Sequence, residues 1–528
     1  MSMKTTTPTD ASPSKRRRFF TWRTLRRIMI TLAWATTIAA LFYGVENWRG
    51  NHAWERSRAD AEAHGAHLDW RKYYVPPPIP DDQNFVMAGN LPQTLFNPDQ
   101  DKIVVSRDLF FKAGKPQVPK PAWTSFHFTD LAAWEKAMTA ATRPGAPAYG
   151  VAFDVSPDPD PASRAAAAPG ILRMMQDVDP TIEELRAASV RPLARYPFHY
   201  DAETPASIGL PYYSTLKVFG ERLRLRACAE LALGRNDDAA ADFKLMSYLA
   251  DSMRNDNFTA AVMVRITMLT SERQVIWEGL AEHRWSDAQL AEIQKTMLAQ
   301  NYVAEMQRDL ESERAAMIEI IEYMRTKADL KTLKLLIGFG YDEGSASSNW
   351  DCKAGVYLLW SMPKGWSQLE KVNYVAAFEE RFGNVFDPAA RRVFPGIMES
   401  NIRNEPAAPR SNSQAILQHR FVQWVGLGVL DQGIVSKAAS AQCQCDEAAI
   451  ACALERYRLA KGAYPAELDA LAPEFIPALP HEVTTGEGYR YRLDGDRYTL
   501  YSVGWDLKDH GGKPGAKQYG MDGDWVWR

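Results

Sequence analysis

The stretch LRLRACAELALGRNDDAAADFKLMSYLADSM, from Leu223 to Met253, decides the fold class of this 528-residue chain. Its second half repeats apolar residues at spacings of four and three, which is the pattern of one face of an amphipathic helix. The repeating residues are Ala239, Phe243, Met246, Ala250 and Met253. Gly234 interrupts the pattern, as a glycine just past a helix C-terminus does. The stretch therefore predicts two helices joined by a short turn.

The same helical signals continue on both sides and predict an α-helical array over residues 171–440. Asp179 and Pro180 form a helix start, and Ser286 with Gln289 forms a capping box. The helix pair at Arg222–Met253 resembles the tetratricopeptide class of α-solenoid. Because no clean period of about 34 residues runs through the region, we expect an irregular, α-solenoid-like array.

A membrane anchor is predicted close to the start of the chain. Residues 1–27 carry eight basic residues against the single Asp10, and the stretch 28–45 that follows has no charge. Such a stretch is just long enough to cross a hydrocarbon core of about 30 Å as a helix. The basic flank predicts a cytoplasmic N-terminus, and hence a single-pass protein of the inner membrane with its bulk in the periplasm. A cleaved signal peptide is the alternative, which the lack of a clean small-x-small cleavage site disfavours.

Between the anchor and the array the chain is less regular. Residues 46–104 are predicted to form a stalk that ends in a Pro-rich, extended strap, VPPPIPDDQNF. Residues 105–170 are of mixed character and predict no particular fold. The net charge of −3 gives no support for nucleic-acid binding.

The five cysteines do not indicate a zinc site. They are Cys228, Cys352, Cys443, Cys445 and Cys452. A closed zinc site needs four ligands, and no histidine lies near the last three to complete one. Two alternatives stay open for these residues, which are simple packing and a single disulfide.

The last part of the chain, residues 446–528, predicts a small α+β domain. A helix over about 446–460 is followed by a short second helix, AELDALAP. The segment GYRYRLDGDRYTLYSVG then alternates strand-forming residues around DGD, which is a hairpin signal. The whole chain is thus predicted to be mainly α, with an N-terminal transmembrane helix, an α-helical array and this α+β tail.

The order of motifs in this tail resembles the globular domain of the major (G-type) pseudopilins of type II secretion. The motifs are ALERYRLAKGAYP, LDALAP, LP, YRYRLDGDRYTLYSVGWDLKDHGG and DGDW, over about residues 446–528. The whole chain is similar to long membrane-anchored bacterial proteins that join a helical array to such a tail. The resemblance implies a calcium-binding last loop, with its two ligand aspartates at Asp506 and Asp524 and with Asp509 and Asp522 as nearby alternatives.

The chemistry of the loop agrees with a calcium ion, which takes six to eight oxygen ligands from carboxylates and carbonyls in a flexible loop. Asp506, Asp509, Asp522 and Asp524 lie among several glycines. The other interpretation is an acidic, solvated turn, and both stay open. The predicted anchor lacks the Phe and Glu residues that are typical of the pseudopilin membrane helix, and it lies about 400 residues before the tail. Assembly into a pseudopilus is therefore not expected.

No catalytic signature is present elsewhere. His64 and His67 are interpreted as surface residues, and Glu305, Asp309 and Glu313 as a solvated acidic stripe on a long helix. We therefore expect a non-enzymatic, membrane-anchored scaffold that binds an extracytoplasmic protein partner and has a calcium-stabilised tail. The alternative is a periplasmic hydrolase whose site is assembled from distant segments of the array.

Overall fold

The protein is described from a computed structural model, which covers residues 22–96, 116–117, 127–142, 153–327, 361–407, 412–421, 427, 430, 432–515 and 521–527. Cys352, most of the predicted basic segment, and residues 105–115, 118–126 and 143–152 of the mixed region lie outside these ranges. The described chain is mainly helical, with one long apolar N-terminal helix and a small C-terminal antiparallel sheet. The predicted fold class is confirmed at this level.

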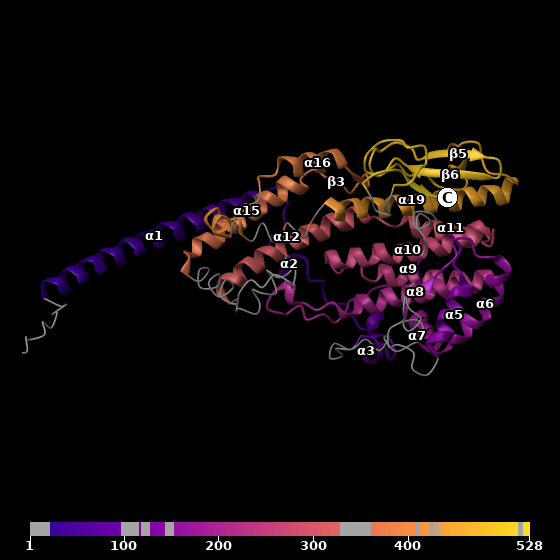
Figure 1. Cartoon of the computed structure of the whole chain (residues 1–528), viewed down its shortest axis with the longest axis horizontal. Coiled ribbons are helices and arrows are strands. Elements are labelled where there is room, and N and C mark those ends of the chain that lie inside the picture. The colour runs from indigo at the N-terminus through magenta and orange to yellow at the C-terminus, as the bar shows by residue number, and fades with distance from the viewer. Residues whose placement is uncertain are drawn as a thin grey trace, which may run out of the picture.

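The first helix, α1 (Trp22–Ala63), leaves the body as a rod (Figure 1). Its apolar part, which includes the predicted span 28–45, is exposed on all sides, and it is long and apolar enough to cross a membrane. A signal sequence near an N-terminus would pass the same test. At about 1.5 Å per residue the helix is about 63 Å long, roughly twice the thickness of a hydrocarbon core. The second half of α1 therefore lies beyond any membrane that the first half spans.

The segment predicted as a stalk packs partly on the body. Its short elements are α2 (Trp70–Tyr73), η1 (Phe85–Met87) and α3 (Leu91–Thr94). Trp70, Phe85 and Leu91 are buried in the main hydrophobic core. The Arg191 guanidinium donates to the backbone carbonyl of Asp81 at 2.7 Å, which ties the Pro-rich strap to the array.

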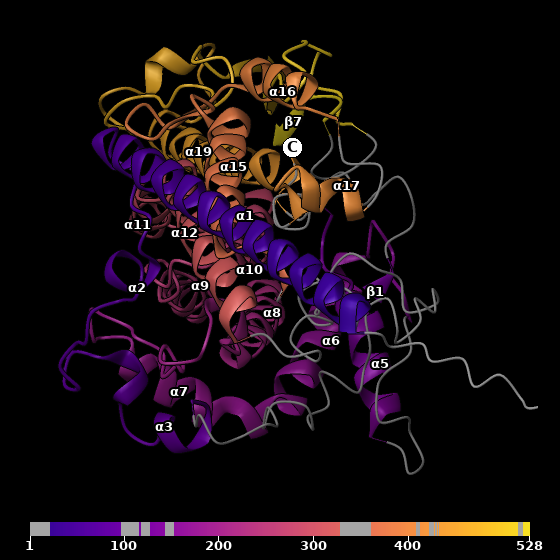
Figure 2. The same cartoon turned by 90° about the vertical axis from the view of Figure 1, so that its left-hand side faces the viewer.

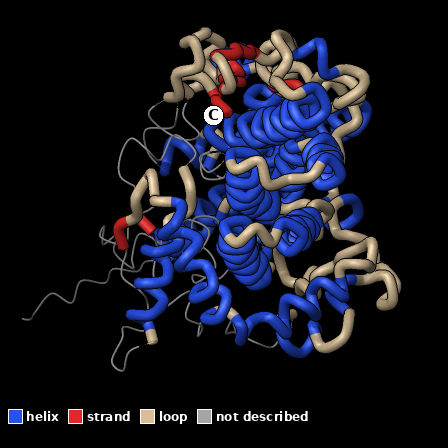
Figure 3. Tube along the Cα trace, turned by 90° about the vertical axis from the view of Figure 1, so that its right-hand side faces the viewer, coloured by secondary structure: helices blue, strands red, loops and turns tan. Residues whose placement is uncertain are grey.

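Helices of the array pack in antiparallel layers (Figures 1 and 3). They are α5 (Leu131–Ala141), α6 (Pro161–Met174), α7 (Asp179–Ala188), α8 (Pro211–Ala232), α9 (Asn236–Asp251), α10 (Thr259–Ala281), α11 (Asp287–Leu298) and α12 (Tyr302–Thr326). Two strands, β1 (Pro116–Gln117) and β2 (Phe153–Asp154), pair in parallel beside α5, and the one-turn helices η4 (Gln176–Val178) and η5 (Pro205–Ser207) join helices. The predicted turn at Gly234 is confirmed by its φ of +73°, as is the Ser286 capping box of α11.

A second group of elements follows at the anchor end. It consists of α15 (Lys364–Phe382), the antiparallel pair β3 (Phe386–Asp387) and β4 (Arg392–Val393), α16 (Pro395–Asn404) and α17 (Asn412–Leu417). Viewed from the anchor end, α1 crosses in front of α15 and α12 (Figure 2). Helix α15 therefore connects α1 with the array.

The tail contains the predicted helices and hairpin. Its elements are α19 (Gln432–Lys461), η6 (Leu468–Leu471), β5 (Arg490–Asp494), β6 (Arg497–Ser502) and β7 (Trp525–Trp527). The strands form an antiparallel sheet in the order β5-β6-β7, in which Tyr491 faces Leu500 and Leu500 faces Trp527. Gly495 makes the predicted hairpin turn with a φ of +61°.

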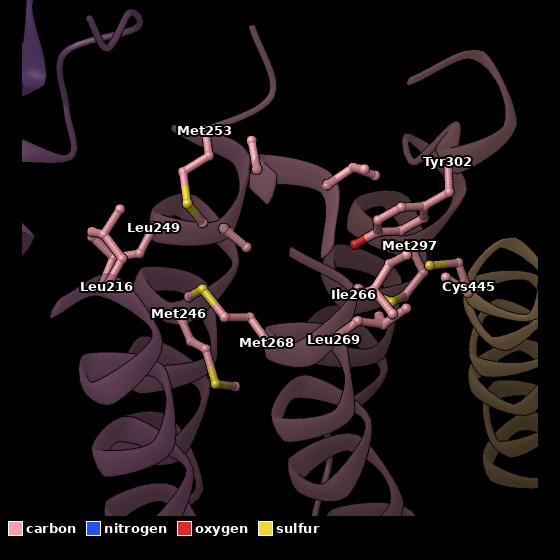
Figure 4. Packing of buried hydrophobic residues seen from close by; sticks show 14 of the residues in the cluster. Leu216, Met246, Leu249, Met253, Ile266, Met268, Leu269, Met297, Tyr302 and Cys445 are labelled. Carbon is pink, nitrogen blue, oxygen red and sulfur yellow. The ribbon is translucent and has the colours of Figure 1, made fainter. Parts of the chain in front are cut away.

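Helix α19 carries the core of the array into the tail. It runs without a break through the predicted domain boundary at residue 446. Cys445 on α19 lies beside Tyr302 and Met297 of the array (Figure 4). One continuous buried cluster extends from Trp70 to Trp527. The tail and the array thus share one core.

The described cysteines are packing residues of the hydrophobic core. Cys228, Cys443, Cys445 and Cys452 are all buried free thiols. Burial raises the pKa of each of these thiols. Of the two alternatives, the structure favours packing for the four described cysteines.

Candidate functional site

Asp524, a predicted calcium ligand, closes the last loop through backbone hydrogen bonds. Its carboxylate is 2% exposed and accepts from the N–H groups of His510 at 3.1 Å and Gly512 at 2.7 Å. A third, longer bond comes from Lys513 at 3.3 Å. Both carboxylate oxygens thus hold the loop against β7.

The other three aspartates lie around the same loop but do not converge on one point. Asp506 accepts from the ring of His510 at 3.0 Å, so Asp506 and Asp524 bond to the same residue, one at its ring and the other at its backbone N–H. Asp509 accepts from the Tyr501 hydroxyl at 3.1 Å. The carbonyl of Asp522 lies close to Gly515. Within the described ranges, no group of three or more His, Cys, Asp or Glu side chains could hold a metal ion. The calcium site stays a prediction.

The predicted solvated stripe on α12 is wrong, because two of its three carboxylates are buried. Glu305 is 5% exposed, Asp309 is 2% exposed and Glu313 is half-buried. This face of α12 packs on α10, which supplies Arg265 as an ion-pair partner for Glu305. The acidic spacing of four was correctly read as one helix face, but the sequence did not reveal the partner arginine on another helix.

Around Arg265 the structure forms a buried network that sequence reasoning missed. The guanidinium donates to the Ala250 carbonyl at 3.0 Å, and to Asp251 and Gln300 at 2.8 Å each. Burial and the nearby Asp251 raise the pKa of Glu272 to about 8. One Glu272 carboxylate oxygen finds no hydrogen-bond partner among the described residues. The network joins α9, α10 and α12.

Helix α1 meets the body at a close contact between two glycines. A Cβ on Gly50 would overlap the carbonyl of Gly365, and a Cβ on Gly365 would overlap that of Glu46. The Gly365 N–H donates to the Asn47 side-chain oxygen at 2.9 Å. The Trp366 indole donates to the Glu46 carboxylate, also at 2.9 Å. Here α1 and α15 pack backbone against backbone, with polar bonds on both sides of the contact.

The same contact extends into the last turn of the predicted span. The Tyr43 hydroxyl donates to the Ser361 carbonyl. The ring of Phe42 lies edge-on to Trp366, with their centroids 6.4 Å apart. The body therefore touches α1 at the level where the predicted span ends.

A small cavity, the junction pocket, lies beside this contact. It has a volume of about 40 Å³. Its lining is Ile321, Met324, Arg325, Met362, Pro363, Trp366, Ser367, Glu370, His419 and Phe421. Most of the lining surface is apolar, and the polar exceptions include Ser367, Glu370 and His419.

His419 is the most unusual residue of the junction pocket. Its φ of +53° lies in the left-handed region that non-glycine residues seldom adopt. Its ring packs on Trp366 at 4.8 Å, and its Nδ1 finds no hydrogen-bond partner among the described residues. Burial, with a contribution from nearby Arg49, lowers the pKa of His419.

The two other polar residues of the junction pocket, Glu370 and Ser367, form hydrogen bonds with backbone atoms. Glu370 accepts from the Phe421 N–H at 2.9 Å. The Ser367 hydroxyl donates to the Lys364 carbonyl at 2.8 Å. The pocket therefore brings Ser, Glu and His together, but the Ser367 hydroxyl is directed at its own helix.

A second cavity, the α12–α15 cleft, opens further along the same helix pair. It has a volume of about 110 Å³. Its lining is Gln307, Leu310, Glu311, Arg314, Phe378, Glu379, Phe382, Gly383, Asn384 and Phe386. Arg314 is buried, pairs with Glu379 and lies 5.0 Å above the Phe378 ring. The cleft thus offers aromatic walls and several charged or amide groups.

Comparison with known proteins gives no relative. No protein-family model, no curated protein and no solved structure matches the chain. The resemblances to pseudopilins and to tetratricopeptide arrays stay predictions, and function has to be argued from the geometry.

Proposed function

We propose that this protein is a scaffold that is anchored in the inner membrane and presents its helical body to a protein partner outside the cytoplasm. The basic residues of the segment 1–27, before the apolar stretch of α1, orient it with the N-terminus in the cytoplasm. A calcium-stabilised tail, resembling a pseudopilin domain, belongs to the same proposal. The observation that carries it is the Gly50–Gly365 contact, because backbone-to-backbone packing holds the body in one orientation relative to α1.

The surface best suited to a protein partner is the α12–α15 cleft. Binding hot spots are typically aromatic or arginine side chains in well-packed pockets with a polar rim. The cleft has three phenylalanines and Arg314, with Gln307 and Glu311 at its edge. Such a lining suits a polypeptide segment that brings both apolar and amide groups.

A photo-crosslinking amino acid at Glu379, whose side chain is 54% exposed, tests this surface in native membranes. The proposal expects a discrete cross-linked protein band. The matched control carries the crosslinker at Glu292, which is exposed on α11, away from the cleft. Identical bands at both positions, or no band at Glu379, would contradict the proposal.

The second candidate function is hydrolysis, and the junction pocket favours it. Ser367, Glu370 and His419 are a nucleophile, an acid and a base in one cavity. A neutral histidine is the form that acts as a general base.

Hydrolysis is tested with the full-length protein and a series of p-nitrophenyl esters of increasing chain length. The hydrolase hypothesis expects turnover that His419→Gln abolishes and that His199→Gln, an exposed control, leaves intact. Turnover that is equal in both variants, or that is absent, would remove this alternative.

A further inference from the structure

The junction pocket lies at the depth of a bilayer interface, given the proposed anchor. Phe42 and Tyr43, in the last turn of the predicted span, contact Trp366 and Ser361. Tryptophan and tyrosine are enriched at this level of membrane proteins because their rings are amphipathic. A cavity that borders Trp366 is therefore within reach of lipid molecules.

Basic residues outnumber acidic ones around the pocket. Arg325 lines it, and exposed Lys364 follows directly on lining residue Pro363. Arg49 is near enough to influence His419, and Arg420 lies between His419 and Phe421. The acidic groups are Glu46, which pairs with Arg49, Glu370, which accepts the Phe421 N–H, and Glu322, which follows lining residue Ile321 and pairs with Lys371. With Lys371 counted as well, five cations against three carboxylates attract an anionic headgroup.

The interior of the pocket suits hydrocarbon rather than a polar ligand. Most of the residues in its walls are apolar, and they are Ile321, Met324, Met362, Pro363, Trp366 and Phe421. Its volume of about 40 Å³ exceeds the ~10–15 Å³ that a cavity needs, on this kind of measure, to hold one water molecule. The cavity thus has room for a short section of an acyl chain, with the rest of the chain remaining in the bilayer.

We propose that the junction pocket binds an anionic phospholipid, with part of an acyl chain against Trp366 and Phe421 and the phosphate near Lys364 and Arg325. A bound lipid would fill the space beside the Gly50–Gly365 contact and stabilise the orientation of the body. This inference rests on the proposed membrane anchor.

The test uses the full-length protein in nanodiscs that contain phosphatidylglycerol with a photoreactive diazirine in its acyl chain. We expect cross-links on the peptides that carry Ile321–Arg325 and Met362–Glu370, in addition to those on α1. Ser367→Met, which fills the pocket, should lower these body cross-links about tenfold, the factor that ~1.4 kcal/mol of lost binding produces. Ala376→Met adds the same side chain at an exposed position of α15 and should leave them unchanged.

Headgroup selectivity is the second measurement. The same diazirine chain on phosphatidylcholine should give clearly fewer body cross-links, because its headgroup carries no net charge. Cross-links confined to α1, or unaffected by Ser367→Met, would overturn the lipid site while leaving the anchor intact. Extraction of the protein from membranes by alkaline carbonate would overturn the anchor itself, so the two failures are distinguishable.

Discussion

At the scale of single residues, the last loop separates structural aspartates from candidate ligands. Asp524 is buried and takes three backbone N–H groups, whereas Asp506 is only half-buried and bonds to the His510 ring. The two residues that the pseudopilin resemblance pairs thus have different surroundings. Their variants should therefore respond differently to calcium.

Asp524→Ala should loosen the loop whether or not calcium is present. Removing the carboxylate leaves the N–H groups of His510 and Gly512 without their partner. A lost charge-assisted hydrogen bond of this kind costs ~2 kcal/mol. Hydrogen–deuterium exchange over residues 506–515 should rise in chelator as well as in calcium. Unchanged exchange in chelator would contradict the structural role of Asp524.

Asp506→Ala tests the calcium prediction directly. If the loop binds calcium, this variant should lower the melting temperature in calcium and have little effect in chelator, because a ligand that binds only the folded state stabilises it. Equal effects in both conditions would remove the calcium site. The variant loses the hydrogen bond between Asp506 and His510 both in calcium and in chelator, so this loss does not contribute to the difference between the two conditions.

Glu272 should make stability depend on pH. Its folded-state pKa is about 8, above the ordinary 4.5 for glutamate. Between these values the folded protein holds a proton that the unfolded chain has lost, so the free energy of unfolding falls as pH rises. The slope for one group is at most ~1.4 kcal/mol per pH unit. Melting temperature should therefore decrease from pH 6 to pH 8.

Glu272→Gln isolates this contribution because glutamine keeps the shape and cannot ionise. The variant should lose less stability than the parent between pH 6 and pH 8. Glu292→Gln, on the exposed face of α11, should follow the parent. A parallel loss in all three proteins would show that Glu272 does not titrate in this range. Asp256, Asp309 and Asp446, whose pKa values burial also raises, then remain as the source of the slope.

At the scale of elements, the sequence was sufficient to predict helix ends and turns that depend only on residues close by in the chain. Gly234, the Ser286 capping box and the turn at Gly495 were all predicted and are all present. The sequence led to wrong or missing predictions where a residue contacts a partner that lies far away in the chain. Glu305 looked solvated because its partner Arg265 lies on another helix. Likewise, nothing adjacent to Gly50 or Gly365 in sequence indicates that they touch.

Gly50→Ala should weaken the contact between α1 and α15. The added methyl group overlaps the Gly365 carbonyl, which is backbone and cannot rotate away. Overpacking of this kind costs about 1–3 kcal/mol. Hydrogen exchange at the start of α15 should increase. Gly44→Ala is the matched control, because a Cβ there meets nothing within 4 Å, and helix propensity makes that change neutral or stabilising by up to ~1 kcal/mol.

At the scale of the whole molecule, the sequence predicted the order of the parts better than their connections. The long apolar helix, the helical array and the small sheet all occur in the expected order. The continuous core from Trp70 to Trp527 was not predicted, because it depends on α19 packing against α10, α11 and α12. The junction pocket was missed for the same reason, since α12, α15 and His419 are separated by long stretches of chain.

A fixed orientation of the body relative to α1 is what the proposed scaffold requires most. It is tested most directly by the distance between two spin labels in nanodiscs, one at Ala33 on the apolar part of α1 and one at Ala376 on α15. Both positions are exposed, and the four described cysteines are buried, so Cys352→Ser removes the remaining thiol. We expect a single narrow distance distribution that Gly50→Ala broadens and Gly44→Ala does not. A broad distribution in the parent protein would contradict it.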